Sequence, residues 1–247
     1  MKLLTIDIET RPIKAYTWGI WQQNIGINQI IDPGGILCFA AKFVGESKIH
    51  FHSQWDDGPA RMARVAHKLL SEADGVMGWN SDKFDLRWLN SQFIANNLGP
   101  PHPFAKIDLM KSSKRHFQLP SNKLDYVAQF LGVGRKIRTG GFDLWDDVMR
   151  GDTKARNKMM RYNIQDVRLT ERVYHAMHDR GWVRGLPNQS IDGGSCCPNC
   201  GSEKIRSTGS WETLTRIYKK WVCLTCQSSF RSIKAEKRTA EFKAVNP

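Results

Sequence analysis

The sequence predicts an α/β sandwich built on a mixed sheet, followed by a small β-rich module. Short strand-like runs come first in the chain and then alternate with segments of helical periodicity up to about residue 180. A stretch rich in Gly, Pro, Asn and Ser follows, and two CxxC pairs lie beyond it. These three observations place a first domain at residues 1–184, a linker at 185–194 and a second domain at 195–247.

The expected elements of the first domain alternate in type along the chain. Strands are expected where short apolar runs are bounded by turn residues, at 2–7, 35–44, 48–53, 75–80 and 105–110. Helices are expected where apolar residues recur at three- and four-residue spacing, at 60–73, 84–97, 123–133, 142–151 and 154–180. Glycines stop two of these helices, at Gly132 and Gly151. We also expect the chain between the last strand and about residue 185 to be mostly helical.

Composition indicates a basic protein with a polyanionic partner. The chain has 40% apolar and 25% charged residues, and its mean hydropathy is −0.48. No apolar run approaches the roughly 20 residues that span a bilayer, and the N-terminus lacks the apolar core of a signal peptide, so we expect a cytoplasmic protein with no membrane partner. The net charge of +13 favours nucleic acid, since Lys and Arg displace counterions from phosphates. A basic protein without such a partner is the alternative.

Three distant segments carry polar residues in positions from which they could converge. Asp7 and Glu9 are two apart on an expected strand, so they project from the same face. Tyr162 and Asp166 are four apart on the longest expected helix and share one of its faces. Asp85 follows the fourth expected strand, near the start of the next helix.

Carboxylates in such a group suit hard divalent cations, which bind several oxygen ligands. Phosphodiester cleavage gains from two such cations about 4 Å apart, one that activates water and one that neutralises the leaving oxygen. We therefore expect Asp7, Glu9, Asp85 and Asp166 to hold two Mg²⁺ or Mn²⁺ ions. Each segment alone has a plainer explanation: a polar strand edge, a helix N-cap or an ordinary helix face.

Two further acids lie near these segments in the sequence. We interpret Asp82 as a loop or cap residue. Asp108 follows an expected strand, and we interpret it as a strand-end group or as a support behind the site. Both are expected to be structural rather than catalytic.

The order DIET, then NxxxFD, then YxxxD resembles the three motifs of the DEDD superfamily of 3′–5′ exonucleases. Tyr162, four residues before Asp166, resembles the DEDDy branch, which includes the proofreading domains of family B DNA polymerases. The related branch has His five residues before that aspartate, where this chain has Arg161. The segment 123–133 also resembles a helix of those proofreading domains. The resemblance spans about residues 3–180 and implies a ribonuclease H-like fold.

The resemblance also implies a role for each residue. Asp7 would bridge both metals, and Glu9 and Asp166 would complete the tighter site that holds the attacking water. Asp85 would serve the second metal. Tyr162 would orient the water through its hydroxyl group.

Five of the six cysteines crowd the end of the chain. Cys197 and Cys200 form one CxxC pair and Cys223 and Cys226 form another, separated by residues 201–222. Four thiolates in two such turns suit one tetrahedral Zn²⁺, and the β-rich segment between them resembles a zinc ribbon. A closed site of this kind would be structural, and a redox dithiol is the alternative. Cys196 is expected to be a bystander.

Basic and aromatic residues of the second domain suit a nucleic-acid surface. The residues expected to bind are Arg216, Lys219, Lys220 and Trp221, together with Arg206, Arg231, Trp211 and Tyr218. In the alternative interpretation the aromatic residues form the small core of the ribbon. The ribbon would then bind a partner, such as a replication or repair protein.

Tyr16, Trp18 and Trp21 follow the first strand closely. They would either stack on the terminal base of a nucleic-acid strand or form a flap buried on the sheet. The sequence favours neither arrangement.

Together these features predict a stand-alone 3′–5′ exonuclease that hydrolyses single-stranded DNA ends and releases nucleoside monophosphates. Two alternatives stay open at this stage. One is an RNA exonuclease or a structure-specific nuclease, and the other is a non-catalytic adaptor that binds nucleic acid.

Overall fold

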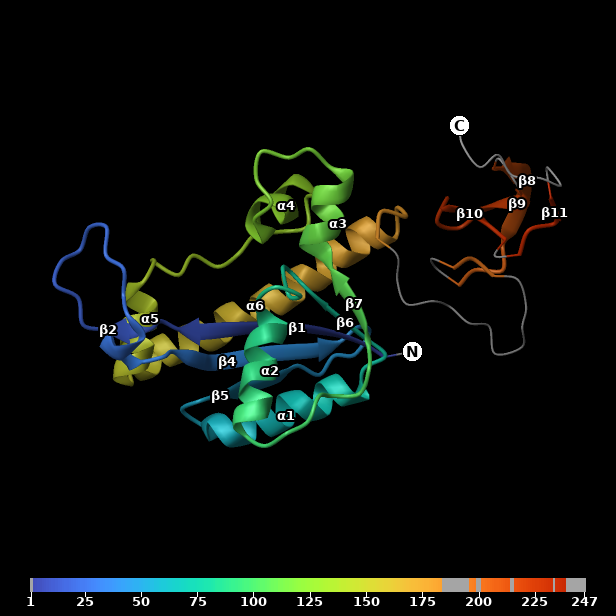
Figure 1. The fold of residues 1–247 in the computed structure, drawn as a ribbon. Helices are drawn as coiled ribbons and strands as arrows, with labels where there is room; N and C mark the ends of the chain where they lie inside the picture. The colour runs from blue at the N-terminus through green and yellow to red at the C-terminus, as the bar shows by residue number, and fades with distance from the viewer. Residues whose placement is uncertain (1, 184–195, 199–200, 214–215, 233, 239–247) are drawn as a thin grey trace. The chain divides into compact units, whose positions relative to one another are not determined.

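The structure is a computed structural model that describes residues 2–183, 196–198, 201–213, 216–232 and 234–238 (Figure 1). The chain divides into two compact units, Met1–Val173 and Tyr174–Pro247. The linker expected at 185–194 and the predicted zinc ligand Cys200 lie outside the described residues. No helix among the described residues is long and apolar enough to cross a membrane.

The first unit is built on a mixed five-stranded sheet with the order β5-β4-β1-β6-β7. The central strand β1 (Leu3–Arg11) pairs antiparallel with β4 (Gly35–Phe43) and parallel with β6 (Gly75–Gly78). At the edges, β5 (His50–Ser53) is antiparallel to β4, and β7 (Ala105–Asp108) is parallel to β6. The predicted α/β class with five strands is therefore confirmed.

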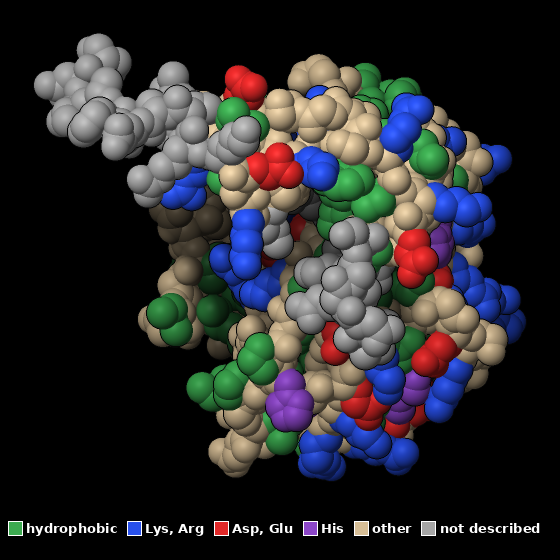
Figure 2. Space-filling model, turned by 90° about the vertical axis from the view of Figure 1, so that its right-hand side faces the viewer, with side chains coloured by type: hydrophobic (Ala, Val, Ile, Leu, Met, Phe, Trp, Pro, Cys, Tyr) green, Lys and Arg blue, Asp and Glu red, His purple; other side chains and the backbone are tan. Residues whose placement is uncertain are grey.

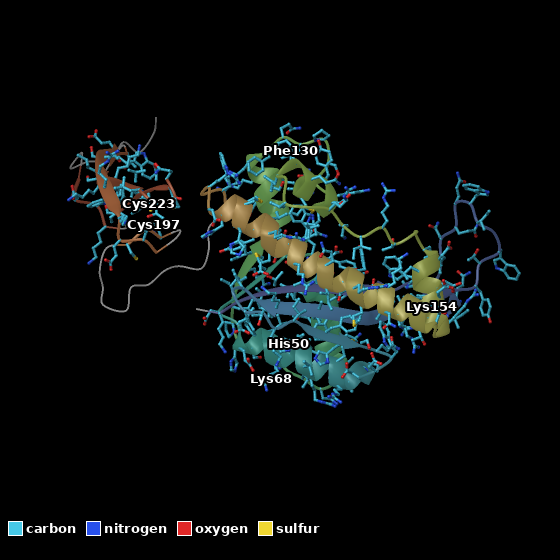
Figure 3. All side chains as sticks on the ribbon, turned by 180° about the vertical axis from the view of Figure 1, so that it is seen from behind. His50, Lys68, Phe130, Lys154, Cys197 and Cys223 are labelled. Carbon is cyan, nitrogen blue, oxygen red and sulfur yellow. The ribbon has the colours of Figure 1, made fainter. Side chains whose placement is uncertain are left out.

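Helices cover both faces of this sheet (Figures 1 and 3). On one face, α1 (Gly58–Glu72) and α2 (Asp85–Ala95) pack against each other and against the strands. The long helix α6 (Thr153–His178) crosses the other face, and α5 (Asp143–Arg150) shares an apolar cluster with it. Two short helices follow β7, namely α3 (Leu109–His116) and α4 (Leu124–Phe130).

Alternation along β1 assigns its side chains to the two faces. Ile6 and Ile8 are buried in the apolar core that β1 and β4 form with α1 and α2. Asp7 and Glu9 alternate with these two isoleucines along the strand, so they point to the opposite face, which α6 crosses. The core that stabilises the sheet thus also aims two carboxylates at one helix.

The fifth strand ends earlier than the sequence predicts. The strand expected at 105–110 ends at Asp108, because the side chain of Asp108 caps a new helix by accepting from the backbone N–H groups of Met110 and Lys111 at 3.0 and 3.2 Å. The chain from Leu109 to His178 is mostly helical, as expected, and residues 134–140, which lie between two of the expected helices, have no regular secondary structure.

Between β1 and β4 the chain leaves the sheet as an arm, residues 12–34 (Figure 1). The arm carries a small two-stranded ladder of β2 (Lys14–Ala15) and β3 (Ile30–Asp32), with a 3₁₀ turn η1 (Ile27–Gln29) before β3. Arg11 and Asp32 form an ion pair at its base. The arm therefore has local structure of its own.

The second unit contains a small antiparallel sheet centred on β9 (Arg216–Cys223). This strand pairs with β8 (Ile205–Glu212) along one edge and with β10 (Ser229–Arg231) and β11 (Lys237–Arg238) along the other. A β-rich module was expected here, and the described strands agree with it.

Candidate active site and metal centres

The strand β1 and the helix α6 bring three of the predicted carboxylates together. Ligand oxygens of Asp7, Glu9 and Asp166 all lie within 4.8 Å of one another. Asp166 is 1% exposed, so it faces the sheet rather than solvent. Oxygen donors this close suit a hard divalent cation, because like charges in a buried group need a counter-charge. The donor set therefore fits Mg²⁺ or Mn²⁺.

Asp85 joins this group through the backbone of β1. Strand β6 pairs with β1 only at residues 3–5, so the edge of β1 beyond them is open. There the backbone N–H of Ile8 donates to Asp85 Oδ1 at 3.0 Å. Asp85 is the first residue of α2 and is buried. The start of α2 is thus fixed against the strand that carries Asp7 and Glu9.

The turn that leads to Asp85 depends on a glycine at the end of β6. A Cβ at Gly78 would lie 2.6 Å from Ser81 Cβ and 3.2 Å from the backbone oxygen of Ile6. Such contacts are too close, so any other residue would push the following turn away from β1. Gly78 therefore helps to set where α2 begins.

Burial and mutual repulsion raise the pKa values of these carboxyl groups. For Asp7, burial is the largest cause, followed by the charge of Asp85. For Glu9, burial and then the charge of Asp166 raise the pKa to about 8. The pKa of Asp85 is raised to about 6, chiefly by burial. Without a cation the group therefore holds protons that ordinary carboxyl groups lose well below neutral pH.

Lys136 is a site residue that the sequence analysis did not identify. Its Nζ lies 2.6 Å from Asp166 Oδ2 and 5.0 Å from the ring centroid of Tyr162. Burial alone would lower its pKa, but the charges of Asp166 and Tyr162 outweigh burial and the pKa is raised. The backbone N–H of Lys136 donates to Asp125 Oδ1 at 2.7 Å, which holds this irregular segment in place. A residue in such a segment has no periodic signal that would reveal it.

Tyr162 and its neighbour Asn163 complete the face that α6 turns towards β1. Tyr162 is buried and packs edge-on against Trp145. Asn163 was not predicted; its Nδ2 donates to Asp7 Oδ2 at 2.7 Å. The sequence signal for Asn163 was its spacing of three residues from Asp166, which places both on one helix face.

The other two acids considered in the sequence have structural partners. Asp108 caps α3 and also accepts from the backbone N–H of Asn80 at 3.1 Å. Asp82 pairs with Lys111 at 2.5 Å on the surface. Both therefore hold the turns around β6 and β7, as expected.

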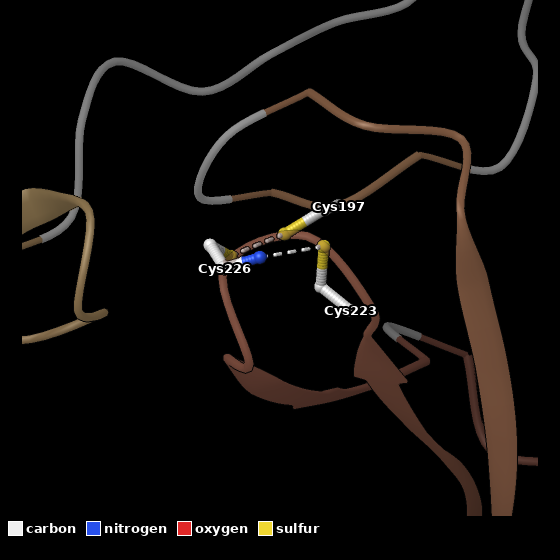
Figure 4. A group of neighbouring side chains, drawn as sticks. All are labelled: Cys197, Cys223 and Cys226. Atoms are coloured by element: carbon white, nitrogen blue, oxygen red, sulfur yellow. Dashed lines mark hydrogen bonds between the residues drawn. The ribbon is translucent and has the colours of Figure 1, made fainter.

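The second unit brings three of the predicted zinc ligands together (Figure 4). Sulfur atoms of Cys197, Cys223 and Cys226 all lie within 4.8 Å of one another, and Cys197 Sγ is 3.6 Å from Cys226 Sγ. Zinc–sulfur bonds of about 2.3 Å in a tetrahedron place sulfurs about 3.8 Å apart. The backbone N–H groups of Thr225 and Cys226 donate to Cys223 Sγ at 3.4 and 3.5 Å. The three described thiols therefore fit a tetrahedral zinc site.

Comparison with known proteins places the first unit in a family. A model of the RNase H superfamily matches residues 4–178, well over half of the chain. The chain belongs to the ribonuclease H superfamily. No curated protein matches it in sequence.

The fold of this superfamily member is similar to part of a solved polymerase. The family B DNA polymerase from the hyperthermophilic archaeon Pyrobaculum calidifontis matches with a TM-score of 0.55 and 19% sequence identity. The match covers 72% of this chain and only 24% of that chain. At 19% identity this similarity concerns the fold alone, and it agrees with the predicted ribonuclease H-like fold.

The arm of this ribonuclease H superfamily member exposes the aromatic residues expected to meet substrate. Trp18 is 99% exposed and Trp21 is 80% exposed. The interpretation of a flap buried on the sheet is therefore wrong. Stacking of these rings on a terminal base stays a prediction.

Basic side chains on one face of the molecule are spread out rather than gathered in a single patch. Lys and Arg are scattered over the face drawn in Figure 2, with acidic side chains between them. Of the predicted nucleic-acid residues in the second unit, Arg216, Lys219 and Lys220 are exposed and Trp221 is partly buried. On the face drawn in Figure 2, net charge alone therefore marks no binding site.

Proposed function

We propose that this protein is a metal-dependent 3′–5′ exonuclease that hydrolyses phosphodiester bonds at the 3′ end of single-stranded DNA and releases nucleoside monophosphates. The observation that carries the proposal is the convergence of the Asp7, Glu9 and Asp166 carboxylates from β1 and α6, with Asp85 at the start of α2 held against β1, in a ribonuclease H superfamily fold. The motif order typical of DEDDy exonucleases supports the 3′–5′ direction. The similarity to a family B DNA polymerase favours DNA over RNA.

Asp7, Glu9, Asp85 and Asp166 would hold two Mg²⁺ or Mn²⁺ ions. When bound, the ions supply an activated water and positive charge at the leaving oxygen. The raised pKa values of Glu9 and Asp85 support this assignment. Ionised carboxylates in this group repel one another, and bound cations would offset that repulsion in place of protons.

Other residues of the chain would orient and balance this group. Asn163 fixes the carboxylate of Asp7 through its bond to Oδ2. Lys136 offsets part of the negative charge at Asp166. Tyr162 would orient the attacking water by a hydrogen bond from its hydroxyl group, since its ring packs against Trp145 and lies 5.0 Å from Lys136 Nζ.

Digestion of labelled oligonucleotides tests the proposal. Single-stranded DNA labelled at its 5′ end should shorten stepwise, and DNA labelled at its 3′ end should release a labelled mononucleotide at once. Both reactions should require Mg²⁺ or Mn²⁺ and stop with EDTA. The Asp7→Asn variant should be inactive under the same conditions.

The same assay separates the alternatives. Faster digestion of an RNA oligomer of equal sequence would replace DNA by RNA as substrate. Cuts only at duplex junctions would indicate a structure-specific nuclease. Binding without any metal-dependent cleavage would indicate a non-catalytic adaptor and overturn the proposal.

A further inference from the structure

The two faces of the sheet in the second unit carry different side chains. Residues paired across neighbouring antiparallel strands lie on the same face. Trp211 pairs with Tyr218, and Lys220 pairs with Arg231, while Tyr218 and Lys220 are two apart on β9. These four side chains therefore share one face.

Two more arginines belong to that face by register. Arg206 pairs with Val222, which is two residues from Lys220, and Arg216 is two residues from Tyr218. We define the basic face as these six residues: Arg206, Trp211, Arg216, Tyr218, Lys220 and Arg231. The register of the described strands places no acidic side chain on it.

The opposite face serves the cysteine cluster. Ile205 pairs with Cys223, and both lie in a small apolar cluster with Phe230. Trp221 pairs with Phe230 and is partly buried on this same face. Glu212 also belongs to this side, since it pairs with Ile217. The apolar core of the ribbon is therefore on the cysteine side, which leaves the aromatic residues of the basic face without a core role.

The aromatic rings of the basic face are stacked with an arginine. The guanidinium carbon of Arg231 lies 4.0 Å from the ring centroid of Tyr218 and 4.8 Å from that of Trp211. The two rings are 6.4 Å apart, and Trp211 is 49% exposed. A guanidinium over aromatic rings presents a flat cation on which a further planar group can stack.

We propose that the basic face is a binding site for single-stranded nucleic acid, separate from the carboxylate group of the first unit. Arg206, Arg216 and Lys220 would contact phosphates, and unstacked bases would stack on Trp211 and on the outer side of Arg231. Duplex bases are already stacked on each other, so a duplex would leave these planar groups unused. An acidic peptide would satisfy the cations but would give the rings no planar partner.

Binding of fluorescently labelled oligonucleotides to the full-length chain tests this site. The Asp7→Asn variant serves as background, because it prevents digestion, and no chelator is added, so zinc is retained. The sequence grouped Lys219 with the residues expected to bind nucleic acid, but the register places it on the cysteine side, so it is removed from the proposed site. The matched pair is therefore Lys220→Gln and Lys219→Gln, two exposed neighbours on opposite faces with the same change of charge. Zinc content and circular dichroism show that each variant is folded.

Lys220→Gln should weaken binding of a single-stranded oligomer several-fold. The slope of log affinity against log salt concentration should fall by the amount expected for about one lost phosphate contact. Lys219→Gln should change both much less. Trp211→Ala should weaken binding roughly tenfold through loss of stacking. Single-stranded DNA and RNA of equal length are compared to identify the sugar preferred.

Equal affinities of the Lys219→Gln and Lys220→Gln variants would overturn the proposal. So would duplex binding as tight as single-strand binding, or complete competition by polyglutamate, which would indicate an acidic protein partner. The result does not depend on the proposed exonuclease activity, which is measured separately on the chain with Asp7 intact. A chain that binds without digesting would refute only the proposed activity, and one that digests while these variants bind normally would refute only the basic face.

Discussion

The two groups of candidate metal ligands in this chain are built in opposite ways. The carboxylates come from three segments far apart in sequence, and they meet only because β1, α2 and α6 pack together. Cys223 and Cys226 come from one tight turn, and Cys197 is brought to them by the pairing of β8 with β9. The oxygen group (Asp7, Glu9, Asp85 and Asp166) therefore depends on the fold of a whole unit. The sulfur group (Cys197, Cys223 and Cys226) depends mainly on short turns.

The groups also differ in how they relate to stability. In the ribbon, a bound zinc ion would supply much of the folding free energy, because the module is small and has little apolar core. In the first unit, a large core already holds Asp7 and Glu9 in place, and the carboxylates oppose folding until cations bind. Loss of metal should thus unfold the ribbon but leave the first unit folded and inactive.

The largest effect is expected when the oxygen group is broken. Asp7→Asn should slow nucleotide release by about 10³-fold or more, because metal-ion catalysis contributes several kcal/mol. Single-turnover release of a labelled mononucleotide measures this rate. Asp82→Asn is the control, since Asp82 pairs with Lys111 outside the group, and it should keep the wild-type rate. Normal release by Asp7→Asn would remove the two-metal hypothesis.

Breaking the sulfur group should affect metal content rather than chemistry. Cys223→Ser should lower bound zinc from about one ion per chain to none, because a structural site needs its four ligands. Elemental analysis measures the zinc, and hydrogen exchange should show loss of protection in β8 and β9 only. Cys196→Ser should retain zinc, as befits a bystander. Full zinc content in Cys223→Ser would contradict the assignment.

A smaller effect is expected when the Tyr162 hydroxyl group is removed, and it should change kcat rather than KM. Tyr162→Phe should lower kcat by about 10²-fold, a loss typical of one acid–base or orienting group, while KM changes little because the ring contacts with Trp145 and Lys136 persist. Steady-state kinetics measure both. Tyr174→Phe, a second buried tyrosine on α6, should behave as wild type. An unchanged kcat in Tyr162→Phe would exclude the role.

The smallest effect concerns the pH dependence of stability without added Mg²⁺ or Mn²⁺. The pKa of Glu9 is raised from 4.5 to about 8 by burial and the charge of Asp166, so the folded chain binds more protons than the unfolded chain in that range. Stability should therefore fall as pH rises from about 4.5 to about 8. Thermal unfolding should show a decrease of a few degrees in Tm.

Two comparisons check the source of this pH dependence. Added Mn²⁺ should raise Tm most at the upper end of the range, because the ion binds only the folded carboxylates. Glu9→Gln should have a flatter profile than wild type. A profile that is equally steep in Glu9→Gln would assign the effect to other groups.

The sequence alone determined the α/β class, the five strands and the residues that could bind metal. Strand alternation and helical spacing are local properties, so Asp7 and Glu9 on one face and Tyr162 and Asp166 on another follow from short-range geometry. The CxxC turns are local for the same reason. Such features can be read from the sequence because the regular repeats of strands and helices fix which residues share a face.

Only the tertiary structure decided which of these faces meet and what else joins them. Lys136 reaches Asp166 from an irregular segment, and Asp85 is held by a backbone N–H left open where β6 ends. In the ribbon, cross-strand register placed Trp211 and Arg231 on the same face as Tyr218 and Lys220. These relations depend on packing between segments distant in sequence, which no local pattern encodes.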